Sequence, residues 1–371
     1  MDTMDTKVVL FRTKTFVSFV SFVSFVASAL LIVSLGSRHP IAAQVPRVVA
    51  TRLAQNPLIT TRSSASLGDN IDGPTVIRVP TWVERPLGRY YMYFAHHMGA
   101  HIRLAYADAI GGPWKIYEPG VLPVRDTAFY RPQPDPPENL ENFYTHVASP
   151  EIFVDEPGRR MVMWFHGWWT DLTRWPVGEA AARAWARAHK YGQFTQAAES
   201  HNGLHFAVRP AITRSSYVRV FPHDGSFYGM ARLGVLLRSK DPAASFEPGP
   251  NPFRDTAYAN RMRHVALLAR GATLHVFFTG IGDTPERVMT STIEMIGDWQ
   301  TWKASTPVEV LRPEAAYECS TLPNEPSSAG DIKGPARQMR DPYVLEDTGK
   351  TFLFYTICGE QGIAAAELSF R

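Results

Sequence analysis

The stretch from Met339 to Leu368, MRDPYVLEDTGKTFLFYTICGEQGIAAAEL, decides the fold. Its turn EDTGK followed by TFLFY predicts a β-hairpin, because Gly349 supplies a positive φ and the alternating aromatic residues suit a pleated surface. Pro342 is tolerated because a proline can occupy the first residue of a strand. The charged pair Arg340-Asp341 before that proline has no such local explanation, and it directs attention to the rest of the chain.

Four other segments repeat the pattern of this stretch. Each has a short apolar strand, a turn, a second strand rich in aromatic residues, a polar loop and a third strand. The five segments lie at residues 72–114, 148–206, 216–246, 263–302 and 339–368. Short strands at this spacing predict an all-β fold, a five-bladed β-propeller, with a β-sandwich as the alternative. The last segment has three strands, so we expect residues 45–65 to supply the outer strand that closes the ring.

Composition agrees with a turn-rich all-β domain. The 371 residues include 29 Pro and 26 Gly, and 12% are aromatic. The net charge is only +3, and no Lys/Arg block alternates with aromatic residues, so we expect no nucleic-acid partner. We expect a monomer.

Residues 1–43 have the layout of a signal peptide or N-terminal anchor. Lys7, Arg12 and Lys14 precede the apolar run Phe16–Leu35, and Ala43 offers a small residue for cleavage. The propeller domain is then 44–371. We expect a secreted or periplasmic protein, which contacts a membrane only if the N-terminal segment stays uncleaved.

Residues 168–195 interrupt the second repeat. The Ala- and Arg-rich part from Gly178 to Lys190 has helical propensity and falls between the second and third strands of blade two. We expect a short helical insertion there, either a lid or a solvated surface helix.

Two cysteines, Cys319 and Cys358, are present. No histidine lies at metal-ligand spacing from them, so they are interpreted as structural, and the sequence leaves open whether they pair.

Connectivity predicts where the polar residues gather. In an up-and-down blade, the start of the first strand and the loop between the second and third strands lie at the same end. Aligning the five first strands on their proline or its equivalent, with a period of two, places one set of side chains in equivalent positions. That set is Glu151, Arg219, His264 and Asp341. Asp72, Arg263 and Arg340 are expected in the opposite phase, flanking them.

The motifs RDPYVLEDTGKTFLFY, SPEIFVDEPGRRMVMWFHG and DGPTVIRVP resemble the blades of glycoside hydrolase family 43, the five-bladed furanosidase-type propellers. The resemblance covers Asn70 to Phe370. It implies an Asp base on blade one, an orienting Asp on blade three and a Glu acid on blade four. Here blade one has Gly73-Pro74, blade three has Tyr217 and Arg219, and blade four has Glu286 only in a loop. The chain therefore resembles a divergent subgroup of this family.

Glycoside hydrolysis needs a carboxylic acid and a carboxylate, some ~6.5–9.5 Å apart in inverting enzymes. The candidate catalytic residues are Asp72 as base, Glu286 as acid, and Asp341 and Glu151 as groups that face the ring. Glu286 is also expected to pair with Arg287. The candidate substrate-binding residues are His96, His97, His166, Trp168, Arg219, His264, Arg287 and Arg340.

Several histidines fall at the same predicted face, and they suit acid–base chemistry or metal binding. We assign no metal ligands. A divalent cation, calcium, is a candidate near His264, because related propellers hold an axial cation near a histidine.

Three functions follow for a carbohydrate ligand. The chain is an exported glycoside hydrolase, another carbohydrate-active enzyme such as a lyase, or a sugar-binding propeller without catalysis.

Overall fold

The computed structural model describes residues 47–130, 145–170 and 191–371, with Ala181 and Ala184. These residues belong to one compact unit, Val45–Arg371. The predicted signal peptide or anchor lies outside the described residues, as does the predicted helical insertion apart from Ala181 and Ala184. Within the described ranges, no helix is both long and apolar enough to cross a bilayer.

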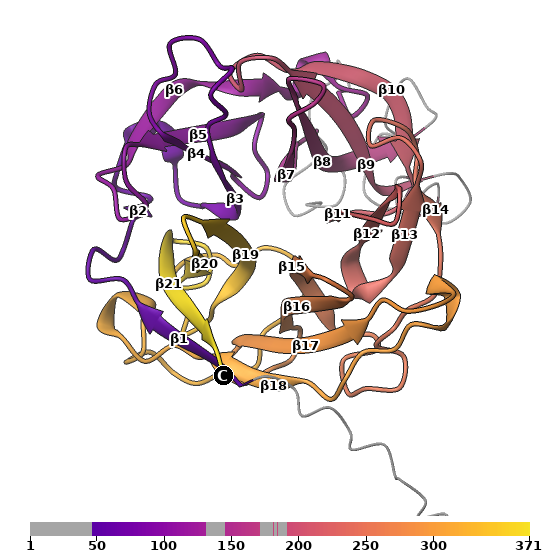
Figure 1. The fold of residues 1–371 in the computed structure, drawn as a ribbon. Helices are drawn as coiled ribbons and strands as arrows, with labels where there is room; N and C mark the ends of the chain where they lie inside the picture. The colour runs from indigo at the N-terminus through magenta and orange to yellow at the C-terminus, as the bar shows by residue number, and fades with distance from the viewer. Residues whose placement is uncertain (1–46, 131–144, 171–180, 182–183, 185–190) are drawn as a thin grey trace, which may run out of the picture. The chain divides into compact units, whose positions relative to one another are not determined.

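The predicted five-bladed β-propeller is confirmed (Figure 1). Four blades are antiparallel sheets of four consecutive strands. Their strands are, for blade one, β3 (Asp72–Arg78), β4 (Tyr90–Ala95), β5 (His101–Ala107) and β6 (Lys115–Pro123); for blade two, β7 (Ala148–Asp155), β8 (Arg160–Thr170), β9 (Tyr191–Ser200) and β10 (Ala207–Thr213); for blade three, β11 (Arg219–His223), β12 (Ser226–Met230), β13 (Leu236–Ser239) and β14 (Glu247–Pro248); and for blade four, β15 (Met262–Arg270), β16 (Thr273–Gly280), β17 (Val288–Glu294) and β18 (Val308–Leu311).

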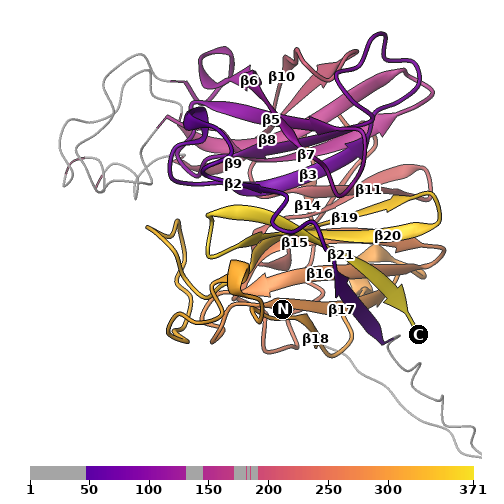
Figure 2. The same ribbon diagram turned by 90° about the vertical axis from the view of Figure 1, so that its left-hand side faces the viewer.

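The fifth blade closes the ring with a strand from the other end of the chain. It contains β19 (Arg340–Asp347), β20 (Lys350–Ile357), β21 (Gly362–Phe370) and β1 (Val48–Arg52). Val48 pairs with Phe370 and Arg52 with Ala366, as predicted, and β1 lies beside β21 in Figure 2. A short strand, β2 (Ile59–Thr60), also pairs with β21.

Neighbouring blades pack face to face, which explains the continuous apolar runs. In β4, Tyr91 and Tyr93 join the cluster shared with blade two, whereas Met92 and Phe94 join the cluster shared with blade five. Because successive side chains of a strand point to opposite faces, a strand covered on both faces is apolar at every position.

Each of four inner strands carries one extra residue near its start. Asp72 pairs with Ala95, but Thr75 pairs with Tyr93, so β3 has three steps where β4 has two. The same bulge occurs at the starts of β7, β15 and β19. A bulge of this kind changes which face the preceding residues share.

The bulge corrects the predicted phase. Ala95 and Tyr93 are two residues apart and share a face, so their partners Asp72 and Thr75 share it as well. Arg340 and Tyr343 are related in the same way. The prediction that Asp72 and Arg340 lie in the opposite phase from the residues after the proline is therefore wrong.

Gly73 is explained by the same bulge. Its φ is +58°, and a Cβ at this position would lie 2.7 Å from Ser149 Cα. Only glycine combines this backbone conformation with such a close approach. Blade one therefore has glycine at the bulge, and its aspartate, Asp72, lies one residue before that glycine.

Cys319 and Cys358 form a disulfide, which links the connection before β19 to the end of β20. The bond closes a loop over a sequence separation of 39. Replacing both cysteines by alanine is expected to lower the free energy of unfolding by about 2–4 kcal/mol, since the unfolded chain gains conformational entropy. Denaturant unfolding of the two proteins measures this, and an unchanged midpoint would contradict it.

Candidate active site

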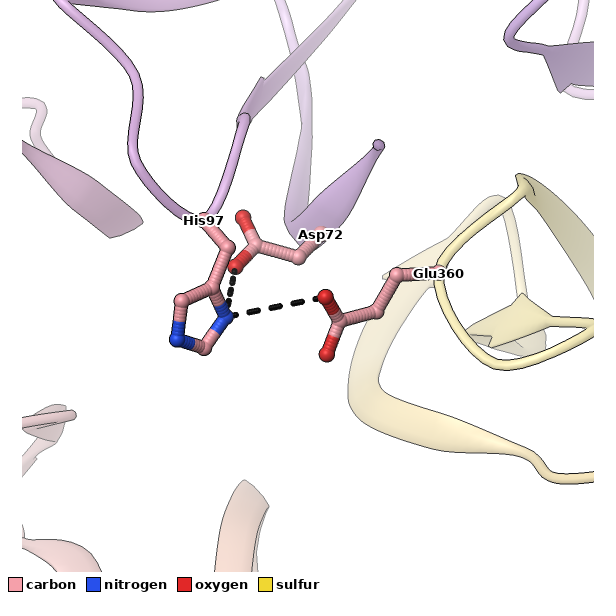
Figure 3. Close-up of side chains that lie close together, drawn as sticks. All are labelled: Asp72, His97 and Glu360. Carbon is pink, nitrogen blue, oxygen red and sulfur yellow. Dashed lines mark ion pairs between the residues drawn. The ribbon is translucent and has the colours of Figure 1, made fainter. Parts of the chain in front are cut away.

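The predicted gathering of polar residues at one end of the ring is confirmed. Asp72 starts β3, His97 lies in the loop between β4 and β5, and Glu360 lies in the loop between β20 and β21. Although 288 positions separate the first and last of these residues (360 − 72), the three side chains meet (Figure 3).

In this triad, the ring of His97 lies between two carboxylates. Its Nδ1 is 3.5 Å from Asp72 Oδ2 and 3.6 Å from Glu360 Oε2. Two carboxylates at one ring nitrogen favour the imidazolium form. Burial opposes the ionised form of Glu360, but the charge and hydrogen bond of His97 outweigh it and hold the pKa of Glu360 below its usual value.

The same three residues could hold a metal ion, because one ligand atom of each lies within 4.8 Å of the others. Glu360, however, already accepts hydrogen bonds from Asn70 Nδ2 at 2.5 Å and Arg340 Nη1 at 2.8 Å. Calcium takes six to eight oxygen ligands, so this set fits calcium poorly. His264 is not part of the set.

Glu286 holds two arginines. Its Oε1 accepts from Arg263 Nε at 2.8 Å, and its Oε2 lies 3.3 Å from Arg340 Nε. Arg340 and Glu286 are both fully buried. The pairing predicted between Glu286 and Arg287 is wrong, because the guanidinium of Arg287 pairs with Glu309 at 2.9 Å.

A second histidine, His264, contacts a single carboxylate. Its Nδ1 lies against Asp341 Oδ1, and Thr356 Oγ1 donates to Asp341 Oδ2 at 3.3 Å. The Tyr217 ring stacks obliquely between His264 and His166, with centroids 4.2 and 4.0 Å away. The local sequence left the charged pair Arg340-Asp341 unexplained. In the structure, each residue of the pair holds a side chain of the site, because Asp341 contacts His264 and Arg340 lies against Glu286.

Burial and neighbouring positive charges oppose the protonated form of His264. Burial, together with the nearby charges of Arg263 and Arg219, lowers its pKa well below the usual value. A neutral ring with its proton on Nδ1, the nitrogen beside Asp341, has Nε2 as an acceptor. His264 Nε2 has no hydrogen-bond partner among the described residues. Burial likewise lowers the pKa of His166 and raises that of Tyr217.

Glu151 and Arg219 form a separate buried network. Arg219 Nη1 donates to Glu151 Oε2 at 2.7 Å, to Thr75 Oγ1 at 2.9 Å and to the Pro150 carbonyl at 2.7 Å. Arg219 Nε also donates to the Val265 carbonyl at 3.2 Å. Burial raises the pKa of Glu151, and Arg219 opposes that change. The network joins four blades around the axis.

A cavity of about 320 Å³ opens beside these groups. It is lined by His97, Trp168, Gln193, Tyr217, Arg232, Arg263, His264, Ala329 and Gly330. Three predicted substrate-binding residues, His97, Trp168 and His264, therefore line it. The remaining predicted site residues are not among those that line the cavity. His96 contacts Asp69 at 3.0 Å and is not among the residues that line the cavity.

Sequence reasoning missed four lining residues, Gln193, Arg232, Ala329 and Gly330. Arg232 lies in the loop between β12 and β13, which connectivity places at the same end as His97. That connectivity could have found it. Gln193 has no comparable signal, because it lies within the interrupting segment 168–195, near the start of β9.

No known family profile matches the chain. An uncharacterized protein of Acanthamoeba polyphaga mimivirus is 33% identical over 341 residues, which cover 85% of this chain and 89% of that protein.

Solved structures of glycoside hydrolases share the fold at low sequence identity. A glycosyl hydrolase from Bacteroides ovatus has a TM-score of 0.54 and 11% identity, covering 87% of this chain and 94% of that one. A family 43 enzyme from Xanthomonas citri, solved with xylose, has a TM-score of 0.51 and 13% identity, covering 87% and 91%. A family 43 protein from Bacillus licheniformis has a TM-score of 0.50 and 13% identity. The match covers 86% of this chain but spans only 54% of the Bacillus chain. The fold is thus that of a family 43-like propeller.

Proposed function

This chain belongs to one protein family with the mimivirus protein, and we propose that it is an exported glycoside hydrolase acting on a poly- or oligosaccharide. The observation that carries the proposal is a pair of histidines, His97 and His264, that line one cavity in different electrostatic environments. His97 lies beside two carboxylates, whereas His264 lies beside one carboxylate and near two arginines. Groups whose environments push their protonation apart are suited to act as acid and base. Export rests on residues 1–43 alone.

In the proposed reaction, His264 is the general base and His97 the general acid. His264 Nε2 accepts a proton from water as the water oxygen bonds to the anomeric carbon. The bond from that carbon to the leaving oxygen breaks, and His97 transfers its proton to this oxygen. Each such proton transfer typically contributes 10²–10⁴ in rate.

The four carboxylates predicted as catalytic then act through other residues. Asp72 and Asp341 are positioning residues, because they contact His97 and His264. Glu286 and Glu151 hold arginines. The proposed reaction uses no metal ion. Calcium near His264 stays a prediction of the sequence, and the positive charges of Arg263 and Arg219 near that histidine disfavour a cation there.

A lyase is the second candidate, because the same cavity lining also suits an elimination. No carboxylate side chain lines the cavity among the described residues, whereas a histidine base, a tyrosine and arginines do. In an elimination, His264 would remove the proton next to a uronate carboxyl group. The electron pair would form a carbon–carbon double bond as the leaving oxygen departs with a proton from His97.

Incubation of the purified full-length chain with neutral and uronate-containing oligosaccharides and aryl glycosides tests both reactions. We expect new reducing ends without absorbance from a new double bond. Absorbance that rises with the reducing ends would assign the lyase. A ligand-induced rise in the melting temperature without turnover would overturn both reactions and leave a sugar-binding propeller.

A further inference from the structure

Two basic side chains that line the cavity, His97 and Arg263, are bound by buried carboxylates. His97 contacts Asp72 and Glu360, and Arg263 is bound by Glu286 at 2.8 Å. Arg263 also donates to the carbonyls of Gly330, at 3.2 Å, and Ser328. The guanidinium of Arg263 and the Nδ1 atom of His97 are thus directed toward protein groups.

Arg232 differs from them. Arg232 lines the same cavity and is partly buried, yet its guanidinium forms no hydrogen bond or ion pair with any described residue. An arginine has five N–H donors and stays charged, so a partly enclosed guanidinium without a partner favours an anionic ligand. No carboxylate side chain among the described lining residues competes for it.

The backbone around Arg232 is firmly held. Arg232 N donates to the Ser216 carbonyl at 3.0 Å, and Gly234 N donates to the Ala231 carbonyl at 3.0 Å. Asn251 Nδ2 donates to the Leu233 carbonyl at 2.8 Å, at a residue whose φ is +66°. The guanidinium is therefore carried on a fixed turn, which lowers the entropic cost of binding a ligand.

We propose that Arg232 binds the carboxylate of a uronic acid residue in the substrate, while Trp168 and Tyr217 supply the aromatic surfaces of the same cavity. The proposal deepens the proposed function and rests on it for the sugar. The planar guanidinium matches a carboxylate through two parallel N–H···O bonds. One unpaired guanidinium also balances the single negative charge of one uronate.

Calorimetric binding of a uronate oligosaccharide and its neutral counterpart to the full chain and to Arg232→Gln tests this. We expect the full chain to prefer the uronate and the variant to lose roughly ten- to hundred-fold in affinity for it, as for hydrogen bonds to a charged group. Affinity for the neutral sugar should stay within about two-fold. The matched control is Arg89→Gln, an exposed arginine at the other end of blade one.

Each outcome is decisive. Equal affinity of the full chain for the charged and neutral sugars, or an unchanged uronate affinity in Arg232→Gln, would overturn the proposal. Preference for a sulfated sugar over the uronate would assign another anion and overturn the carboxylate. Uronate binding that depends on Arg232 supports the proposal even if no bond is cleaved, in which case only the enzymatic function fails.

Discussion

Replacing His264 by asparagine is expected to lower kcat/KM by roughly 10²–10⁴-fold, the usual contribution of a general base. Asparagine can place an amide donor near the position of Nδ1, so the contact with Asp341 can persist while the acceptor Nε2 is lost. The loss should appear mainly in kcat, because the base acts on the reacting proton and contributes little to binding of the sugar.

The pH dependence provides a second readout for the same residue. A base must be deprotonated to act, and the pKa of His264 lies below the usual histidine value. The acidic limb of the pH–rate profile of the unaltered protein should therefore lie below pH ~6.5. A variant that folds, as judged by its melting temperature, and keeps full activity would remove His264 from the mechanism.

Replacing Arg219 by methionine is expected to destabilise the protein by about 3–5 kcal/mol, because Glu151 would be left buried without its counter-charge. Glu151 is only 7% exposed, so water cannot replace the lost guanidinium. The carbonyls of Pro150 and Val265 would lose donors as well. Denaturant unfolding measures the change in the free energy of unfolding.

The matched control replaces both partners. In the double variant Arg219→Met/Glu151→Leu no unpaired charge is buried, so most of the lost stability should return. A double variant as unstable as Arg219→Met alone would show that the hydrogen bonds to the blade carbonyls, rather than the orphaned charge, account for the loss.

The blades could be predicted because their signals are local. A turn such as EDTGK and a buried run such as YYMYFA specify a meander within about 30 residues. Connectivity then placed Asp72, His97 and Glu360 at one end of the ring. The phase of the inner strands could not be read from a period of two, because a bulge adds a residue that the sequence does not mark unambiguously.

The chain alone therefore specified five meanders, a ring closed by its own N-terminal strand, and the end at which polar groups collect. Those features depend on hydrophobic pattern, turn residues and chain connectivity. Which side chains reach the cavity, and in what protonation state, was decided only when distant segments packed together. The reason is electrostatic, because His97 and His264 differ in the carboxylates and guanidiniums that other blades bring to them, and charge interactions depend on separation in space.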